Sequence, residues 1–292
     1  DHVTILRSGK SVEFLKTTET TEKELAALMV GYEIDMTLER KKVEKGETIL
    51  SLQNVRLLPQ AEKTVDLEIR AGEILGIAGV EGNGQQQLEE MIMGLEKVKC
   101  GKIFFKQEEI TGMSVKERCK RGIGYIPSDR YKRAILPGFS LKDNYLLGNQ
   151  YKDSYARKGM LNQEYIEKKT KELMEKFDVR AVNGDQLIGA LSGGNQQKLV
   201  LSREVDKDPD LILACQPVRG LDIGAIKFIH NVLLELRNQG KAVLLISAEL
   251  SDLFQLSDRI GVLYKGEMMS LQETEKYTTE SISLLMAGKK GV

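Results

Sequence analysis

The sequence reads Leu191-Ser192-Gly193-Gly194-Asn195-Gln196-Gln197-Lys198, and an amphipathic run over residues 199–203 follows it. Ser192 is a natural N-cap, because its hydroxyl can accept a hydrogen bond from the first helical turn. The two glycines allow the backbone to close on a phosphate. Free N–H groups and the helix dipole favour an anion at such a helix start. The stretch therefore predicts a helix that begins in an anion-binding turn, with a glycine-rich turn that binds nothing as the alternative.

A second glycine-rich turn lies earlier in the chain. Residues 73–78 indicate a buried strand that runs into Gly79-Val80-Glu81-Gly82-Asn83-Gly84-Gln85-Gln86-Gln87, and an amphipathic helix is expected next. A strand, a glycine-rich loop and a helix form the context of a P-loop, and Gly79 and Gly84 have its spacing. This loop is therefore a second candidate phosphate site.

The loop lacks two side chains that a working P-loop uses. A Lys normally reaches the β- and γ-phosphates and a Ser or Thr holds Mg²⁺, but Gln85 and Gln86 stand at those positions. The backbone cradle can persist, because it is built from N–H groups and glycines. We therefore expect nucleotide binding here without efficient catalysis. The candidate cofactor-binding residues are Gly79, Glu81, Gly82, Asn83, Gly84, Gln85, Gln86 and Gln87.

Leu-Ser-Gly-Gly-x-Gln-Gln is also the signature sequence of the ABC ATPase family. With the P-loop and further motifs in the same order over residues 49–288, the chain resembles the second ATP-binding domain of tandem ABC importer ATPases for simple sugars and nucleosides. Residues 122–130, Gly-Ile-Gly-Tyr-Ile-Pro-Ser-Asp-Arg, are similar to the Pro-Glu-Asp-Arg segment of that group, with Ser where Glu is common. Residues 216–225 and the Gly79 loop look most like its nucleoside-type branch.

The resemblance implies an α/β fold class, the ABC-type P-loop NTPase fold. This fold has a three-layer, mainly parallel sheet core, an antiparallel β edge subdomain and an inserted helical subdomain, here at about residues 140–205. The hydrophobic pattern agrees, because residues 49–55 and 63–69 alternate like strands of an antiparallel edge sheet. Strands that alternate with helices, as a three-layer parallel sheet requires, are expected around Leu75, Ile123, Leu211, Val243 and Ile260.

The resemblance also implies that this domain has lost several catalytic side chains. A core strand of the family normally ends Asp-Glu-Pro, where the Asp supports Mg²⁺ and the Glu polarises the attacking water. Anchored on Pro217, these positions are Cys215 and Gln216. Ala248 stands where the family places a His that contacts the γ-phosphate, and Ser128 where it places a Gln near the metal. The domain's own site is therefore expected to be degenerate, with no metal ligand of its own.

In this family two ABC domains pack head-to-tail, and each nucleotide lies between the P-loop of one domain and the signature of the other. The signature residues that would act in trans on ATP and Mg²⁺, at a composite site with the partner domain, are Ser192, Gly193, Gly194 and Gln196. The contact loop between the paired domains would consist of Gly220, Leu221 and Asp222.

The start of the chain repeats its end. Residues 1–10, Asp-His-Val-Thr-Ile-Leu-Arg-Ser-Gly-Lys, echo residues 258–267, Asp-Arg-Ile-Gly-Val-Leu-Tyr-Lys-Gly-Glu, and the match continues without a gap. Such a repeat indicates tandem homologous units, with a chance match as the alternative. We expect residues 1–33 to be the strand–turn–helix tail of a preceding ABC domain, 34–48 a solvated linker and 49–292 the second ABC domain. A first residue other than Met agrees with this expectation.

Composition narrows the choice of partners. Lys plus Arg and Asp plus Glu both number 43, so nucleic acid is not an expected partner. Cys100, Cys119 and Cys215 have neither metal nor disulfide spacing, which fits a reducing cytoplasm. No apolar run is long enough to cross a bilayer, so membrane association is expected to go through partner proteins.

The resemblance implies where the chain would work. It would lie at the cytoplasmic face of the cell membrane, held there by integral-membrane permease subunits. The missing first ABC domain would be a direct partner, and a substrate-binding protein an indirect one. Candidate docking contacts in the helical subdomain, for which loop or core packing is the favoured alternative, are Tyr145, Tyr151, Tyr155 and Tyr165.

Two other functions remain open. A self-sufficient ATPase would use Glu81, Glu249 or Asp222 in place of the missing carboxylate. A soluble ABC protein that acts on ribosomes would need no membrane partner. The neutral charge and the importer-like residues 129–130 and 219–220 argue against this second alternative.

Overall fold

The centre of the molecule is a six-stranded sheet with the strand order β14-β13-β5-β12-β11-β8. The computed structural model describes residues 1–7, 9–30, 38 and 40–289. The strands of the central sheet are β5 Ile74–Ala78, β8 Ile123–Ile126, β11 Leu211–Cys215, β12 Ala242–Ile246, β13 Arg259–Tyr264 and β14 Glu267–Glu273. All neighbouring pairs are parallel except β13 and β14 at one edge. The mainly parallel core sheet predicted from the sequence is confirmed.

Both faces of this sheet are buried, because side chains alternate between two apolar clusters. In β12, Val243 and Leu245 belong to one cluster, and Leu244 and Ile246 belong to the other. Every residue of β5, β11 and β12 is buried. Burial on both faces explains why these strands are continuous apolar runs in the sequence.

A four-stranded antiparallel sheet covers one face of the central sheet. It has the order β4-β3-β6-β7. Its strands are β3 Thr48–Val55, β4 Val65–Arg70, β6 Lys102–Phe105 and β7 Glu108–Glu109. Residues alternate between buried and exposed along β4, as expected when one face of a sheet is solvated. The strands predicted at residues 49–55 and 63–69 are confirmed. Helix α2, Gln85–Met93, shares the same apolar cluster as this sheet.

Helices cover the opposite face of the central sheet. Helices α8, Ile223–Asn238, and α9, Leu250–Leu256, contribute apolar residues to the second cluster. Helix α10, Thr279–Met286, packs against β13. Two short helices, α3 (Val115–Lys120) and α4 (Arg130–Arg133), lie before and after β8 in the chain.

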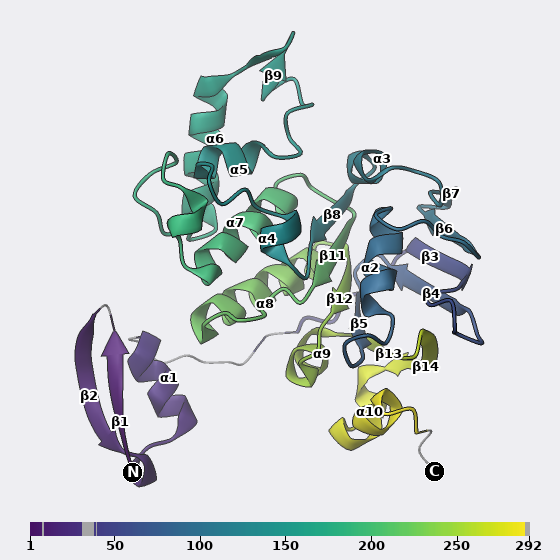
Figure 1. The fold of residues 1–292 in the computed structure, drawn as a ribbon, viewed down its shortest axis with the longest axis horizontal. Helices are drawn as coiled ribbons and strands as arrows, with labels where there is room; N and C mark the ends of the chain where they lie inside the picture. The colour runs from purple at the N-terminus through teal and green to yellow at the C-terminus, as the bar shows by residue number, and fades with distance from the viewer. Residues whose placement is uncertain (8, 31–37, 39, 290–292) are drawn as a thin grey trace.

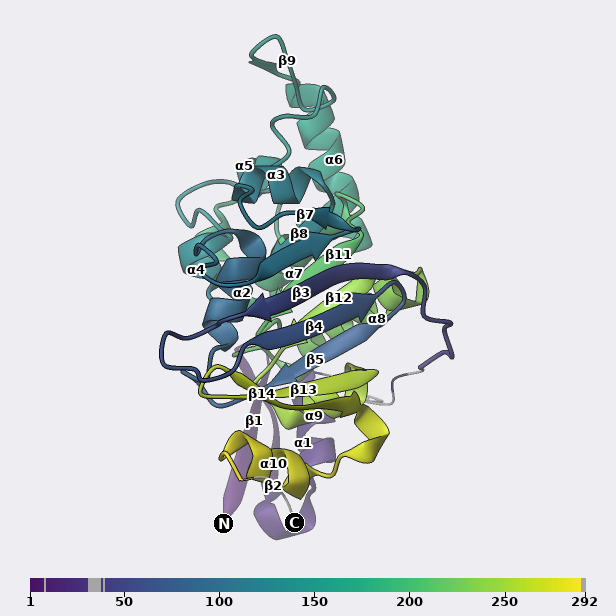
Figure 2. The ribbon, with the colours of Figure 1, turned by 90° about the vertical axis from the view of Figure 1, so that its right-hand side faces the viewer.

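A helical subdomain projects from the sheet. Figure 2 shows α6 and β9 at one end of the molecule and α10 and the N-terminus at the other. The elements of the subdomain are α5 Leu141–Leu146, β9 Ala156–Arg157, β10 Met160–Leu161, α6 Gln163–Lys176, η2 Ile188–Ala190 and α7 Gly193–Val205. Tyr145 and Tyr155 are buried in it, so the favoured alternative, core packing, is confirmed for these two residues. Tyr165 packs edge-on against Tyr155, with ring centroids 5.0 Å apart, and Tyr151 is exposed.

The N-terminal residues form a hairpin and a helix that repeat the element order of the C-terminal end. The first set is β1 His2–Arg7, β2 Lys10–Lys16, η1 Thr17–Glu19 and α1 Glu22–Val30; β13, β14, η3 (Thr274–Lys276) and α10 are the second set. Figure 1 shows the first set apart from the central sheet. β13 pairs with β14 and with β5, whereas β1 pairs only with β2 within the described residues.

The linker predicted at residues 34–48 lies partly outside the described residues. In its described part, Arg40 Nη2 lies 2.8 Å from Asp258 Oδ1. Lys45 Nζ lies 3.4 Å from carboxylate oxygens of both Glu73 and Glu273. Residues 40–47 are mostly exposed, and ion pairs of Arg40 and Lys45 attach them to the main body.

The buried side chain of Arg118 ties α2 to its surroundings. Its guanidinium donates hydrogen bonds to the carbonyl oxygens of Met91 (2.7 Å), Ile92 (2.7 Å), Thr111 (2.9 Å) and Met113 (3.0 Å). Two of these carbonyls belong to the last turn of α2, where a helix leaves its own acceptors unpaired. Arg118 thereby caps the helix that begins in the Gly79 loop.

We expect Arg118→Met to lower the free energy of unfolding by about 3 kcal/mol, because four buried acceptors lose their charged donor. Chemical denaturation measures the change. Arg121→Met is the matched control, because it removes an exposed ion pair with Glu108 and should leave the free energy of unfolding almost unchanged. Equal losses in the two variants would contradict this account of Arg118.

Candidate functional site

The first candidate site lies at the start of α7. Ser192 is the N-cap of this helix, and its Oγ accepts hydrogen bonds from the backbone N (3.4 Å) and Nδ2 (3.0 Å) of Asn195. A Cβ on Gly194 would lie 3.0 Å from the Cβ of Ala225, and one on Gly193 would lie 2.8 Å from Arg130 Nη2. The predicted helix start at Ser192 is confirmed. A side chain at Gly194 would therefore crowd Ala225 on α8, whereas Arg130 could move away from a side chain at Gly193.

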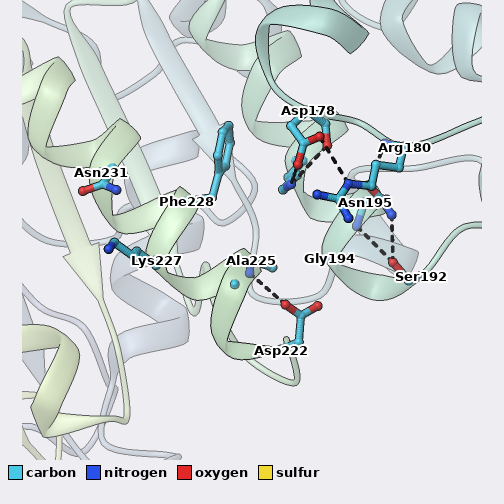
Figure 3. A pocket seen from close by; sticks show the side chains of 12 residues that line it. Asp178, Arg180, Ser192, Gly194, Asn195, Asp222, Ala225, Lys227, Phe228 and Asn231 are labelled. Carbon is cyan, nitrogen blue, oxygen red and sulfur yellow. Dashed lines mark hydrogen bonds and ion pairs between the residues drawn. The ribbon is translucent and has the colours of Figure 1, made fainter. Parts of the chain in front are cut away.

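A pocket of about 460 Å³ opens beside this helix start. Figure 3 shows Ser192 and Asn195 on one side of it and Asp222 and Phe228 on the other. Asp222 is the N-cap of α8, and its Oδ1 accepts a hydrogen bond of 2.9 Å from the backbone N of Ala225. The pocket therefore lies between the N-terminal ends of two helices, which favour a negatively charged ligand.

The predicted contact loop reaches the same pocket. Gly220 has a φ of +71° and is exposed, and Leu221 is half-buried. Asp222 at the end of this loop lines the pocket. The loop is thus placed beside the signature, at the surface of the molecule.

Gln196 has a different place from the other signature residues. Its side chain is 1% exposed. Its Nε2 donates hydrogen bonds to Tyr131 Oη (3.0 Å), to the carbonyl of Leu191 (3.2 Å) and to that of Ile188 (3.3 Å). Its Oε1 accepts a hydrogen bond of 3.2 Å from Arg130 Nε. All four partners belong to this chain, so Gln196 shapes the turn before α7 and does not line the pocket.

The second candidate site is the Gly79 loop, which joins β5 to α2. Gly82 and Gly84 have φ values of +89° and +108°, which L side chains rarely adopt. Asn83 anchors the loop through two hydrogen bonds of 2.9 Å. Its side-chain Oδ1 accepts from the backbone N of Lys265, and its backbone carbonyl accepts from the backbone N of Gly266. Gly84 is the N-cap of α2 and offers no side chain to the N–H groups of the first turn. The backbone therefore fits a phosphate group.

Two side chains of the loop, those of Gln85 and Gln86, form hydrogen bonds with other groups of this chain. Gln85 Nε2 donates to the carbonyl of Val80 at 3.1 Å. The same nitrogen lies 2.2 Å from the position that a Cβ on Gly79 would occupy. The Gln85 amide therefore fills the space beside Gly79. Gln86 Nε2 donates to Glu90 Oε1 at 2.8 Å, one turn further along α2. Glu81 is exposed, and Gln87 is half-buried in the first turn.

Ser128 and Cys215 meet a carboxylate that sequence reasoning did not single out. Glu89 on α2 is 2% exposed. Its Oε1 accepts hydrogen bonds from the backbone N (3.3 Å) and the Oγ (3.4 Å) of Ser128, and from Tyr125 Oη. Burial and the nearby carboxylate of Glu89 raise the pKa of the Cys215 thiol well above its usual value. In the sequence Glu89 is one polar residue of an amphipathic helix, and no local pattern singles it out.

Gln216 and Ala248 lie next to each other at the ends of β11 and β12. Gln216 has a φ of +47°, and its Oε1 accepts a hydrogen bond of 3.3 Å from the backbone N of Ala248. Neither residue carries a carboxylate or an imidazole. His230 is buried elsewhere, with Nε2 3.3 Å from Asp252 Oδ1.

The carboxylates considered as replacements have other surroundings. Asp222 lines the pocket beside Ser192 and caps α8. Glu249 is exposed at the start of α9, where its backbone N donates to Ser247 Oγ at 3.1 Å. Within the described ranges, no three His, Cys, Asp or Glu side chains are grouped as a metal site. The side chains of Gln85 and Gln86 in the Gly79 loop present amides, and neither a hydroxyl nor a carboxylate.

Comparison with known families and proteins gives a consistent result. The model of the family described as ABC transporter matches residues 62–219. The guanosine import ATP-binding protein NupO of Bacillus subtilis is 40% identical over 292 residues, which cover 99% of this chain and 57% of that protein. The nucleoside import ATP-binding protein NupA of Lactococcus lactis is 36% identical, with 99% and 58% covered. The chain therefore spans a little over half the length of these relatives.

Solved structures share the fold. A nucleotide-free ATP-binding cassette from an ABC transporter has a TM-score of 0.65 at 21% identity, over 82% of this chain and 96% of that one. A dimeric cassette in a post-hydrolysis state with ADP and Pi has a TM-score of 0.66 at 23% identity, over 78% and 100%. In the part of this chain that the structure describes, no helix is both long and apolar enough to span a membrane.

We expect Cys215 to resist alkylation in the folded chain. Its raised pKa keeps the thiol protonated at pH 8, and the thiolate is the reactive form. Cys100 is exposed and serves as the internal control. Iodoacetamide at pH 8, followed by peptide mass spectrometry, should label Cys100 first and label Cys215 only after unfolding. Comparable labelling rates in the native chain would show that this strand end is open to solvent.

Proposed function

The chain belongs to the ABC transporter family, and we propose that it is the C-terminal ATP-binding domain of a tandem importer ATPase. In this role it lends its signature to a partner ABC domain, which holds ATP and Mg²⁺ at a composite site. One contrast carries the proposal. The start of α7 at Ser192 is intact and open beside a pocket, whereas Gln85 and Gln86 of the Gly79 loop are turned to partners within the chain.

The replaced residues support a degenerate site in this domain. Phosphoryl transfer is catalysed mainly by charges placed around the phosphates, with a base or polariser for water. Cys215, Gln216 and Ala248 supply none of these charges, and Gln216 instead bonds to the backbone of Ala248. Asp222, one of the carboxylates that a self-sufficient ATPase would need, lines the signature pocket. The signature is therefore the contribution to catalysis that this domain retains.

The domain arrangement that we propose has residues 1–33 as the tail of a preceding ABC domain, 34–48 as the linker and 49–292 as the second ABC domain. The repeated order of β1, β2 and α1 and of β13, β14 and α10 supports it. β13 gains a parallel neighbour in β5, and we infer that β1 pairs in the same way with a core strand of the preceding domain. The relatives' greater length agrees with this inference.

The proposed cargo is a nucleoside or a simple sugar. The relatives named above are importers of guanosine and nucleosides, and a ribose import protein of Clostridium tetani is 34% identical over 97% of this chain and 55% of its own length. We infer permease subunits and, through them, a substrate-binding protein as partners, at the cytoplasmic face of the membrane. Leu136, Phe139 and Leu187 are exposed around the start of α5 and provide an apolar surface for a permease.

The central test uses the tandem protein. We expect Ser192→Arg to lower its ATPase rate at least about tenfold, because the added side chain blocks the signature where a second domain's phosphate would sit. Ser114→Arg is the matched control, since Ser114 is also a helix N-cap but belongs to α3. A steady-state assay with purified protein gives both rates. An unchanged rate in Ser192→Arg would mean that the working site does not use this signature.

The 292-residue chain alone should hydrolyse MgATP at no more than the background rate, because its own site lacks the required charges. A phosphate-release assay with a Gly84→Asp variant separates true activity from contamination. An acidic side chain at Gly84 would repel phosphate from the loop. A clear rate that Gly84→Asp abolishes would favour a self-sufficient ATPase and overturn the degenerate site.

A further inference from the structure

Glu89 and Glu90 on α2 contact the three positions at which the resemblance to ABC ATPases places groups that hold the metal. These positions are residues 86, 128 and 215. Glu90 Oε1 accepts from Gln86 Nε2, at the usual Ser or Thr position. Glu89 Oε1 accepts from the N and Oγ of Ser128, at the usual Gln position, and lies beside the Cys215 thiol. All three positions thus have partners within the chain.

Arg133 of α4 supplies a positive charge to both carboxylates. Its Nη2 donates to Glu90 Oε1, and its Nη1 lies 4.0 Å from Glu89 Oε1. The same Nη1 donates to Tyr125 Oη at 3.3 Å, and that hydroxyl donates to Glu89. The arginine side chain is 20% exposed, and those of Glu89 and Glu90 are 3% and 15% exposed. The charges therefore interact with little screening by water.

The protonation state of Glu90 agrees with this arrangement. Burial raises the pKa of its carboxyl, but hydrogen bonds from Gln86 and Arg133 and the charge of Arg133 outweigh burial, so that the pKa lies below its usual value. Glu90 is therefore ionised at neutral pH, and the guanidinium is its counter-charge.

The groups beside the loop are poor ligands for a magnesium ion. Mg²⁺ requires near-octahedral oxygen ligands at about 2.1 Å. Glu89 Oε1 already accepts three hydrogen bonds, Glu90 Oε1 accepts two, and Gln86 presents the donor end of its amide. A cation that approached these carboxylates would also meet the guanidinium of Arg133.

We propose that the Gly79 loop binds the triphosphate of a nucleotide without a divalent cation, because the guanidinium of Arg133 already serves as the counter-charge of Glu90, the partner of Gln86. The backbone N–H groups at the start of α2 hold the phosphates, and Glu89, Glu90 and Arg133 form a fixed link in place of a metal bridge. The inference rests on the part of the proposed function that assigns ATP to this loop.

Isothermal titration of ATP into the 292-residue chain, once with excess Mg²⁺ and once with EDTA, tests the proposal directly. We expect the two dissociation constants to agree within about threefold, which is less than 0.7 kcal/mol. Binding that is tenfold or more tighter with Mg²⁺ overturns the proposal. Absence of binding in both buffers overturns it as well, and leaves the role of the signature to be judged by Ser192→Arg in the tandem protein.

An arginine variant tests the cause. Arg133→Gln leaves Glu89 and Glu90 without their counter-charge, so Mg²⁺ should now raise the midpoint of thermal unfolding, by about 2 °C or more, whereas the unmodified chain should not respond. Arg121→Gln, which frees the exposed Glu108, is the matched control and should not respond. The double variant Arg133→Gln, Glu90→Gln should lose most of the response. If Mg²⁺ does not change the midpoint of thermal unfolding of Arg133→Gln, the guanidinium does not take the place of a metal.

Discussion

Burial of both faces of the central sheet is the constraint on which the rest of this structure depends. With Val243 and Leu245 in one apolar cluster and Leu244 and Ile246 in the other, polar groups are confined to the strand ends. The carboxyl ends of parallel strands meet at one edge of the sheet. The Gly79 loop and residues 128, 216 and 248 come together there, because each follows one of these strands. The site is thus positioned by the core and does not require its own catalytic residues in order to form.

The short helix α4 contacts both α2 and α7, the helices that begin at the two candidate phosphate sites. Arg133 at its end bonds to Glu90 on α2, and Arg130 at its beginning donates to Gln196 on α7. Both arginines lie within a single helical turn. Helix α2, which follows the Gly79 loop, and helix α7, which begins at Ser192, are therefore joined by side-chain contacts to α4 as well as through the sheet.

Sequence reasoning succeeded where a local pattern decides the structure. Ser192 caps α7 because its hydroxyl needs only the next turn as a partner, and β4 shows the alternation that its residues predict. It did not find Glu89, which in the sequence is one more polar residue of an amphipathic helix. Its partners Tyr125 and Ser128 follow more than thirty positions later, so only packing of α2 against β8 brings them together.

Helix α2 begins at Gln85, within the stretch that the sequence predicts as loop. The sequence does predict the fold class, the helix start at Ser192 and the uncharged residues 215 and 216. These follow from residue type and spacing over a few positions, which local sterics and hydrogen bonding translate directly into structure. The inward orientation of Gln196, the burial of Tyr145 and the pairing of Arg133 with Glu90 arise from tertiary packing. Those outcomes depend on the burial of segments far apart in the chain, and no local pattern encodes which of their polar groups will meet.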